Sequence, residues 1–196
     1  SNYSESGATA LAYLRGMIED GSVSEAVVNY TQEDARTQFI TGKAAMMING
    51  PWELSTLNKD AEIEWDVAPL PKDKRAATSM GGENVVVMNG AKQSEAAVKL
   101  AKYLTSAEGA KIYCDGSGQL SSRPDLQGKL KLSSDPKLKV FEDQLQYAHA
   151  RAYGKDYPKI SEAIQLSMQE ALTGASTPEA AAKKAAETIN PLLPKN

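Results

Sequence analysis

The chain has 196 residues, an apolar fraction of 41%, a charged fraction of 24% and a formal net charge of −3. This length allows one domain or two small ones with a real hydrophobic core, and the balanced charge argues against a nucleic-acid binder. The single cysteine, Cys114, excludes an intrachain disulfide, and no apolar run reaches the ~20 residues that a membrane-spanning helix needs.

Apolar periodicity and turn residues divide the chain into short elements. In chain order, the pattern predicts a helix over residues 5–20, a helix over 31–41, a strand over 44–48, a helix that starts at Pro51, strands over 63–70 and 85–88, helices over 94–104 and 106–114, a loop over 115–135, and helices over 136–150, 157–172 and 177–189. Each predicted strand is a short apolar run between helices. This pattern is typical of an α/β fold with a buried sheet.

The sequence offers few residues for a catalytic or metal-binding site. His149 is the single histidine, so a histidine-rich zinc site is excluded, and we expect it to be a partly exposed helix residue. Cys114 ends an apolar helical stretch and is predicted to be a packed thiol. No GxSxG, GxxxxGK[ST] or HExxH motif is present. These searches give no sign of an enzyme, although pairs of carboxylates cannot be assigned from the sequence, and we expect no cofactor and no metal.

Aromatic and polar loop residues remain as candidates for ligand contacts. Trp52 follows a Gly-Pro turn, where an indole can offer a flat apolar platform to the C–H face of a sugar. Composition alone favours the alternative that Trp52 is a core residue. Gly81 and Gly82 allow close approach of backbone N–H groups to a ligand, and Glu83 and Asn84 can bond hydroxyl groups, although an ordinary glycine turn explains the same stretch.

Several stretches resemble one known family. Phe39 to Trp52, FITGKAAMMINGPW, resembles the signature of the sugar-binding proteins of bacterial ABC importers, the extracellular solute-binding group that includes maltose-binding protein. Other stretches resemble the family in order and spacing, namely Val67–Pro71, Gly81-Gly82, Ser94–Ala97, Tyr103–Ser106 and Ser122–Asp125, the last with a shifted residue order. The resemblance covers essentially the whole chain.

The resemblance implies a fold class: α/β, a helix-rich periplasmic-binding-protein-like (type II) lobe, incomplete, with a segment belonging to the other lobe. Residues 1–74 and 129–196 would form the C-terminal lobe, and 75–128 would cross into the N-terminal lobe. The partner strands of this segment are expected outside the chain. Because unpaired strand edges are liabilities, we expect another chain to hold it, either a second copy in a domain-swapped homodimer or a neighbour in a crystal.

The resemblance also implies a function: oligosaccharide binding in a closing cleft for ABC-type import. Trp52 would stack on a sugar ring. The ligand-binding residues would be Trp52, Gly81, Gly82, Glu83, Asn84, Arg151 and Tyr153. The implied partners are a carbohydrate and the membrane permease of an ABC importer, with no nucleic acid.

The implied location is extracellular or periplasmic, with a lipid anchor on an N-terminal segment upstream of this chain. Two other functions remain open. One is a helical interaction module without a ligand, in which Trp52 is core. The other is a glycan-active enzyme, which would need two suitably spaced carboxylates.

Overall fold

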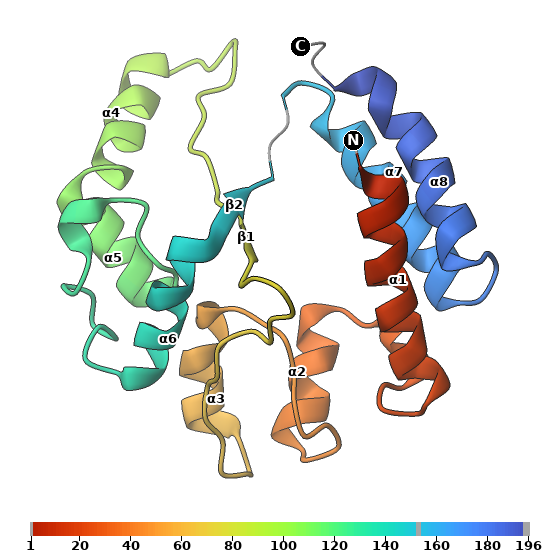
Figure 1. Cartoon of the computed structure of the whole chain (residues 1–196). Helices are drawn as coiled ribbons and strands as arrows, with labels where there is room; N and C mark the ends of the chain where they lie inside the picture. The colour runs from red at the N-terminus through yellow and green to blue at the C-terminus, as the bar shows by residue number, and fades with distance from the viewer. Residues whose placement is uncertain (1, 152–153, 194–196) are drawn as a thin grey trace. The chain divides into compact units, whose positions relative to one another are not determined.

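The computed structural model of the chain describes residues 2–151 and 154–193, and its helices and strands are labelled in Figure 1. The chain divides into two compact units. Unit 1 is built from the two ends of the chain, up to Ala35 and from Arg151, and unit 2 is Arg36–Ala150. This division concerns packing within the chain, so the assignment of 75–128 to another lobe stays a prediction.

Unit 1 is a bundle of three helices, which lie side by side in Figure 1. They are α1 (Tyr3–Glu19), α7 (Tyr157–Leu172) and α8 (Pro178–Ile189), with the short 3₁₀ turns η1 (Glu25–Asn29) and η5 (Asn190–Leu192). The core is rich in alanine, which lets the helix backbones approach closely. Its buried residues are Ala8, Leu11, Ile160, Ala163, Ala171, Ala181, Ala182, Ala185 and Ile189.

Among the described residues, α1 is joined to α7 by two polar contacts. Arg15 of α1 donates to the carbonyl oxygen of Leu172, 2.6 Å away, at the end of α7. There Gly174, with φ +76°, adopts the left-handed conformation that often ends a helix. The hydroxyl groups of Tyr3 and Ser167 are hydrogen-bonded at 2.9 Å. Both contacts satisfy polar groups that the packing of the bundle covers.

Unit 2 consists mainly of short helices. These are α2 (Gln32–Ile40, which begins in unit 1), η2 (Pro51–Glu53), α3 (Leu54–Asp60), α4 (Ser94–Leu104), α5 (Ala107–Ser117), η3 (Pro124–Leu126), α6 (Pro136–Gln144) and η4 (Leu145–Tyr147). Strands β1 (Thr78–Met80) and β2 (Ala148–Ala150) pair in parallel, with Ser79 opposite His149. None of the described helices has the length and apolar character that a membrane span requires.

Most predicted helices are confirmed, because their capping and periodicity are local signals. Helices over 5–20, 31–41, 94–104, 157–172 and 177–189 are found with small differences at their ends. The helix predicted over 106–114 extends to Ser117. The helix predicted over 136–150 is wrong beyond Gln144, where η4 and β2 follow. His149 therefore lies on a strand, and it is exposed.

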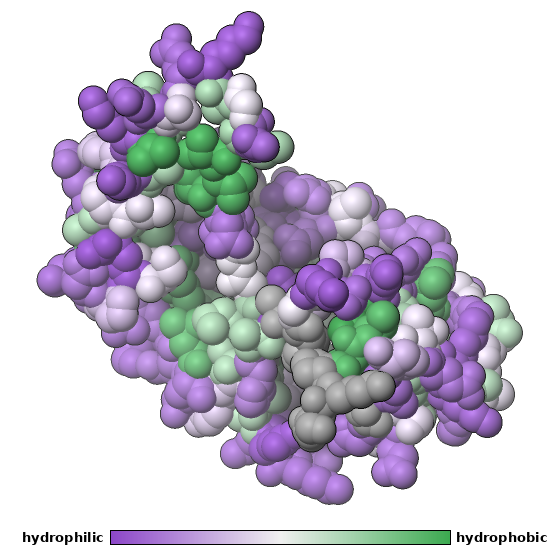
Figure 2. Space-filling view, turned by 90° about the horizontal axis from the view of Figure 1, so that it is seen from above, coloured by the Kyte–Doolittle hydropathy of each residue, from purple (hydrophilic) through white to green (hydrophobic). Residues whose placement is uncertain are grey.

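The strands predicted over 44–48, 63–70 and 85–88 are wrong, and so is the buried sheet inferred from them. A strand is held by a neighbour that accepts and donates its backbone hydrogen bonds, and no described residue pairs with these runs as a ladder. In the run 63–70, Ile63, Trp65 and Val67 are half-buried. In the runs 44–48 and 85–88, large apolar side chains stay exposed: 85% for Met46, 78% for Ile48, 71% for Val86 and 74% for Met88. Figure 2 shows apolar patches of this kind among hydrophilic surface.

Candidate functional site

A cavity of about 740 Å³ lies within unit 2. Five of the seven predicted site residues line it: Trp52, Gly81, Gly82, Glu83 and Asn84. Arg151 is an exposed residue of unit 1, and Tyr153 lies outside the described residues. The structure therefore brings five predicted residues together, and the assignment of Arg151 and Tyr153 to the site stays a prediction.

Trp52 is held in the cavity wall by its neighbours in η2. Pro51 occupies the first position of this turn, and the preceding Gly50 is extended. A Cβ added at Gly50 would lie 2.1 Å from the Trp52 ring, so the ring rests directly on the Gly50 backbone. The side chain is still 37% exposed. Trp52 is therefore not a core residue, and part of its ring is available to a ligand.

The Gly81–Asn84 segment follows β1 and is exposed throughout. Neither glycine has a positive φ, and a Cβ added at Gly82 would meet nothing within 4 Å. The backbone conformation and the packing of the chain therefore do not require glycine at position 82. The open space beside its backbone leaves room for a ligand atom to approach.

Trp65 also lines the cavity, and the sequence analysis did not select it. It is half-buried, and Lys137 Nζ lies 4.9 Å from the centroid of its ring. A cation at this distance is attracted to the ring face. The alternating apolar run 63–67 gave a signal for this residue, but it predicted a core position in a strand.

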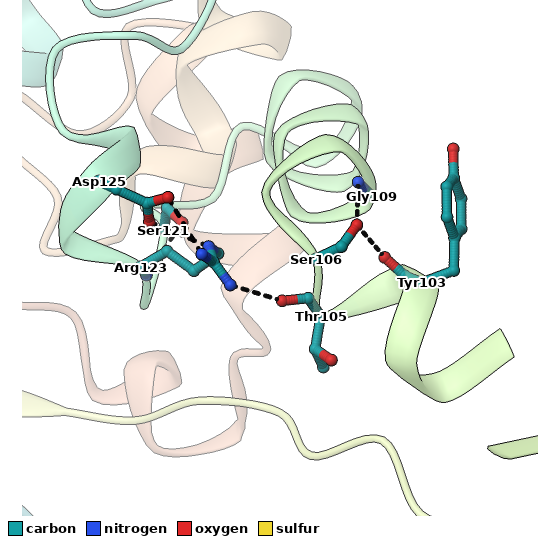
Figure 3. Close-up of polar contacts among 7 residues, drawn as sticks. All are labelled: Tyr103, Thr105, Ser106, Gly109, Ser121, Arg123 and Asp125. Atoms are coloured by element: carbon teal, nitrogen blue, oxygen red, sulfur yellow. Dashed lines mark hydrogen bonds and ion pairs between the residues drawn. The ribbon is translucent and has the colours of Figure 1, made fainter. Parts of the chain in front are cut away.

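Arg123 fixes one wall of the cavity to the turn between α4 and α5 (Figure 3). Its Nε and Nη2 each donate to the Asp125 carboxylate at 3.0 Å, and Nη1 donates to the Thr105 carbonyl oxygen at 3.0 Å. The hydrogen bonds from Arg123 lower the pKa of Asp125, and the carboxylate raises the pKa of Arg123. The guanidinium charge is thus neutralised by Asp125.

The α4–α5 turn itself is tightly closed. Ser106 Oγ donates to the Tyr103 carbonyl oxygen at 2.7 Å and accepts the Gly109 N–H at 3.1 Å, which caps α5. A Cβ added at Gly109 would lie 2.1 Å from the Tyr103 carbonyl oxygen. Glycine is therefore required at position 109 for this turn.

Gln144, at the end of α6, provides a buried acceptor in the cavity wall. Its Oε1 has no hydrogen-bond partner within the described part of the chain. An unsatisfied buried acceptor costs about 1–3 kcal/mol. A ligand hydroxyl that donates to this oxygen would remove the cost.

Residues 2–151 and 154–193 contain no group of three or more His, Cys, Asp and Glu side chains placed to hold a metal ion. Cys114 is 6% exposed, as its predicted packing requires. Burial raises the pKa of its thiol.

The chain is similar to known proteins. Residues 2–140 match the family model described as bacterial extracellular solute-binding protein. A maltooligosaccharide ABC transporter solute-binding lipoprotein of Streptococcus pneumoniae is 30% identical over 103 residues, which cover 51% of this chain and 24% of that protein.

Two solved structures are similar over 98% of the chain. An ABC transporter solute-binding protein of Thermotoga lettingae bound with α-D-tagatose has a TM-score of 0.85, 32% identity and 50% of its chain covered. The maltose-bound MalE3 of T. maritima has a TM-score of 0.81, 30% identity and 52% covered. The chain thus spans about half the length of these structures, and the likeness confirms the predicted helix-rich, type II periplasmic-binding-protein-like fold class.

Proposed function

Because the chain belongs to the bacterial extracellular solute-binding protein family, we propose that unit 2 carries part of an oligosaccharide site that serves ABC-type import. The observation that carries this proposal is the half-exposed Trp52 ring, fixed on Gly50 in the wall of a cavity. Aromatic rings that keep one face free suit the flat C–H face of a sugar. The S. pneumoniae and T. maritima relatives, whose names specify maltooligosaccharide and maltose, support this ligand class.

Polar groups around Trp52 match the hydroxyl rim of a sugar. Glu83 and Asn84 are exposed in the cavity wall and offer a carboxylate and an amide. Gln144 adds a buried acceptor that lacks a donor from the described residues. The open backbone at Gly82 allows a ring to approach closely. The proposed ligand is a neutral oligosaccharide, since Arg123 is already neutralised and the cavity offers no free cation among its lining residues.

Saturation-transfer NMR tests the proposal, because it detects weak binding by this chain. Maltooligosaccharides and galactooligosaccharides at millimolar concentration should receive saturation at their ring C–H protons. Trp52→Ala should abolish the transfer. Tyr13→Ala should leave it unchanged, because Tyr13 is a 66% exposed aromatic residue of unit 1 and provides a matched control.

Equal transfer in the wild type and Trp52→Ala would contradict the proposal and favour an interaction module without a sugar ligand. Release of shorter sugars during the same incubation would instead favour a glycan-active enzyme. We expect no turnover, because the relatives are named as transport proteins.

For the whole protein we propose a membrane permease as partner, an extracellular or periplasmic location and an N-terminal lipid anchor. The S. pneumoniae relative, named a lipoprotein of an ABC transporter, supports all three. Metabolic labelling of the complete gene product with a lipid precursor tests the anchor. Absence of label would contradict it.

The segment 75–128 is proposed to be held by a second copy in a swapped homodimer. Val86 and Met88, 71% and 74% exposed, support a covering partner because exposed apolar runs favour association. Sedimentation should show a dimer that Val86→Lys with Met88→Lys dissociates, while Tyr13→Lys does not. A monomer at every concentration would contradict this part of the proposal.

A further inference from the structure

A partly buried polar network, with Glu53 at its buried centre, closes the turn that carries Trp52. Glu53, the next residue, is only 4% exposed. Its Oε2 accepts a hydrogen bond from Arg36 Nη1 at 3.0 Å, and its Oε1 accepts one from Asn49 Nδ2 at 3.4 Å. Asn49 Oδ1 in turn accepts the N–H of Gly50 at 2.9 Å. These hydrogen bonds therefore tie both ends of the Asn49–Glu53 turn to each other and to Arg36.

This network connects α2 to the Trp52 ring. Arg36 lies on α2, and Glu53 is 17 residues further along the chain. The Glu53 N–H donates to the Gly50 carbonyl oxygen at 3.2 Å, and the Trp52 ring rests on the Gly50 backbone. A displaced Glu53 side chain would thus rotate the short turn on which the ring is mounted.

Stability alone gives a weak reason for such a network. A buried ion pair contributes little net stability, and apolar residues of similar volume often hold a protein together equally well. Removal of one partner is costly, because it leaves the other charge buried and unpaired. What directional hydrogen bonds add over apolar contacts is a defined orientation.

We infer that Arg36, Asn49 and Glu53 are positioning residues that set the orientation of the Trp52 ring toward its ligand. The inference rests on the proposed function for its ligand, although the ring orientation can be measured without one. None of the three residues needs to touch the sugar. They act through the Asn49–Glu53 turn, and Arg36 anchors that turn to α2.

The test uses the full chain with Trp65→Phe, so that Trp52 is the single tryptophan. The near-ultraviolet circular dichroism band of Trp52 reports the fixed environment of its ring, and the sugar titration reports affinity. Arg36→Leu and Glu53→Leu should each lower the urea midpoint. The double variant should recover the midpoint, yet lose the Trp52 band and bind sugar about tenfold more weakly, the lower end of the loss seen when residues that orient the ligands of metal sites are removed.

Two further variants separate positioning from packing. Arg36→Lys keeps the charge and one donor, so it should restore part of the band. Removal of the exposed Lys139–Asp143 pair on α6, by leucine at both positions, should leave the band unchanged. This pair serves as the matched control for loss of an ion pair in unit 2.

A double leucine variant that keeps both the Trp52 band and wild-type sugar affinity would overturn the inference. Loss of the band with unchanged affinity would also overturn it, because the ring orientation would then not matter to the ligand. If no form binds sugar, the wild type included, the proposed function fails. The band in the double variant then still decides whether the network orients Trp52.

Discussion

Unit 1 and unit 2 use their apolar residues differently. In unit 1, alanines of α7 and α8 pack with Ala8 and Leu11 of α1 and are almost fully covered, with Ala171 and Ala182 at 0% exposure. In unit 2, the apolar runs 44–48 and 85–88 place large side chains on the surface, with Met46 at 85% and Met88 at 74% exposure. Covered apolar area supplies most of the stability of a fold. Unit 1 therefore buries its apolar residues in one helical core, whereas unit 2 has a small core around Cys114, Leu126 and Leu130 and leaves several apolar runs exposed.

The difference has a simple origin in secondary structure. A helix satisfies its backbone hydrogen bonds internally, so three helices suffice for the core of unit 1. A strand needs neighbours on its edges. The apolar runs of unit 2 lack such neighbours in the described chain. Unit 2 is held by short helices, a small core of Cys114, Leu126 and Leu130, the β1–β2 pair and polar contacts such as the hydrogen bond from Arg123 to the Thr105 carbonyl oxygen.

The largest expected effect tests whether apolar burial dominates unit 1. Leu11→Ala, at a site 2% exposed, should lower the free energy of unfolding by about 3 kcal/mol, through lost burial and a cavity. Leu100→Ala on α4, at 58% exposure, should change it by less than about 0.5 kcal/mol. Urea titrations followed by circular dichroism measure both. Equal losses would remove the contrast between the units.

The next effect concerns the α4–α5 turn of unit 2. Gly109→Ala should destabilise by about 1–3 kcal/mol, because the added Cβ meets the Tyr103 carbonyl oxygen at 2.1 Å and the backbone must move. Gly116→Ala on the same helix meets nothing and should stabilise by roughly 0.5–1 kcal/mol. Thermal unfolding of the pair checks the sign. Stability changes of opposite sign would show that close backbone packing at the α4–α5 turn contributes to the stability of unit 2.

Removal of a helix cap should lower the free energy of unfolding by the same amount in both units, because a cap acts locally. Thr177 Oγ1 accepts the Ala180 N–H at 3.2 Å in unit 1, and Ser106 Oγ accepts the Gly109 N–H at 3.1 Å in unit 2. Alanine at either cap should cost about 1 kcal/mol. Chemical denaturation compares the two, with Thr177→Ser as the conservative control. A far larger loss at Ser106 would show that its bond to Tyr103 also matters.

The smallest effect is the pH dependence of a polar contact. Hydrogen bonds from Lys111 Nζ and the Lys131 N–H lower the pKa of Asp115. A carboxylate whose pKa is lowered on folding stabilises above its unfolded pKa, and this contribution fades as the pH falls below about 4. Asp115→Asn should cost a few tenths of a kcal/mol at pH 7. The difference from wild type should shrink as the pH is lowered from 7 to 2, and a constant difference would contradict the assignment.

By itself, the sequence determined the helices of this protein, their caps and its family. Thr177 before Pro178 and the spacing of 157–172 are local signals, so α7 and α8 were predicted nearly residue by residue. The stretch FITGKAAMMINGPW led to Trp52. The sequence did not predict the strands correctly. The runs 44–48 and 85–88 are apolar enough for strands of a sheet, but a run forms a strand only where a neighbouring strand pairs with it.

The tertiary structure alone decided which side chains meet in unit 2, in the wall of the cavity and behind it. Nothing in the order of residues joins Arg36 to Glu53 or Lys137 to Trp65, since each pair is separated along the chain and selected by three-dimensional packing. Trp52 illustrates what the sequence predicted and what the fold added. Its sequence context marked it as a site residue, whereas its 37% exposure and its rest on Gly50 follow from the folded turn. Local patterns fix helices and caps through neighbouring backbone groups, and only the fold brings distant partners within bonding distance.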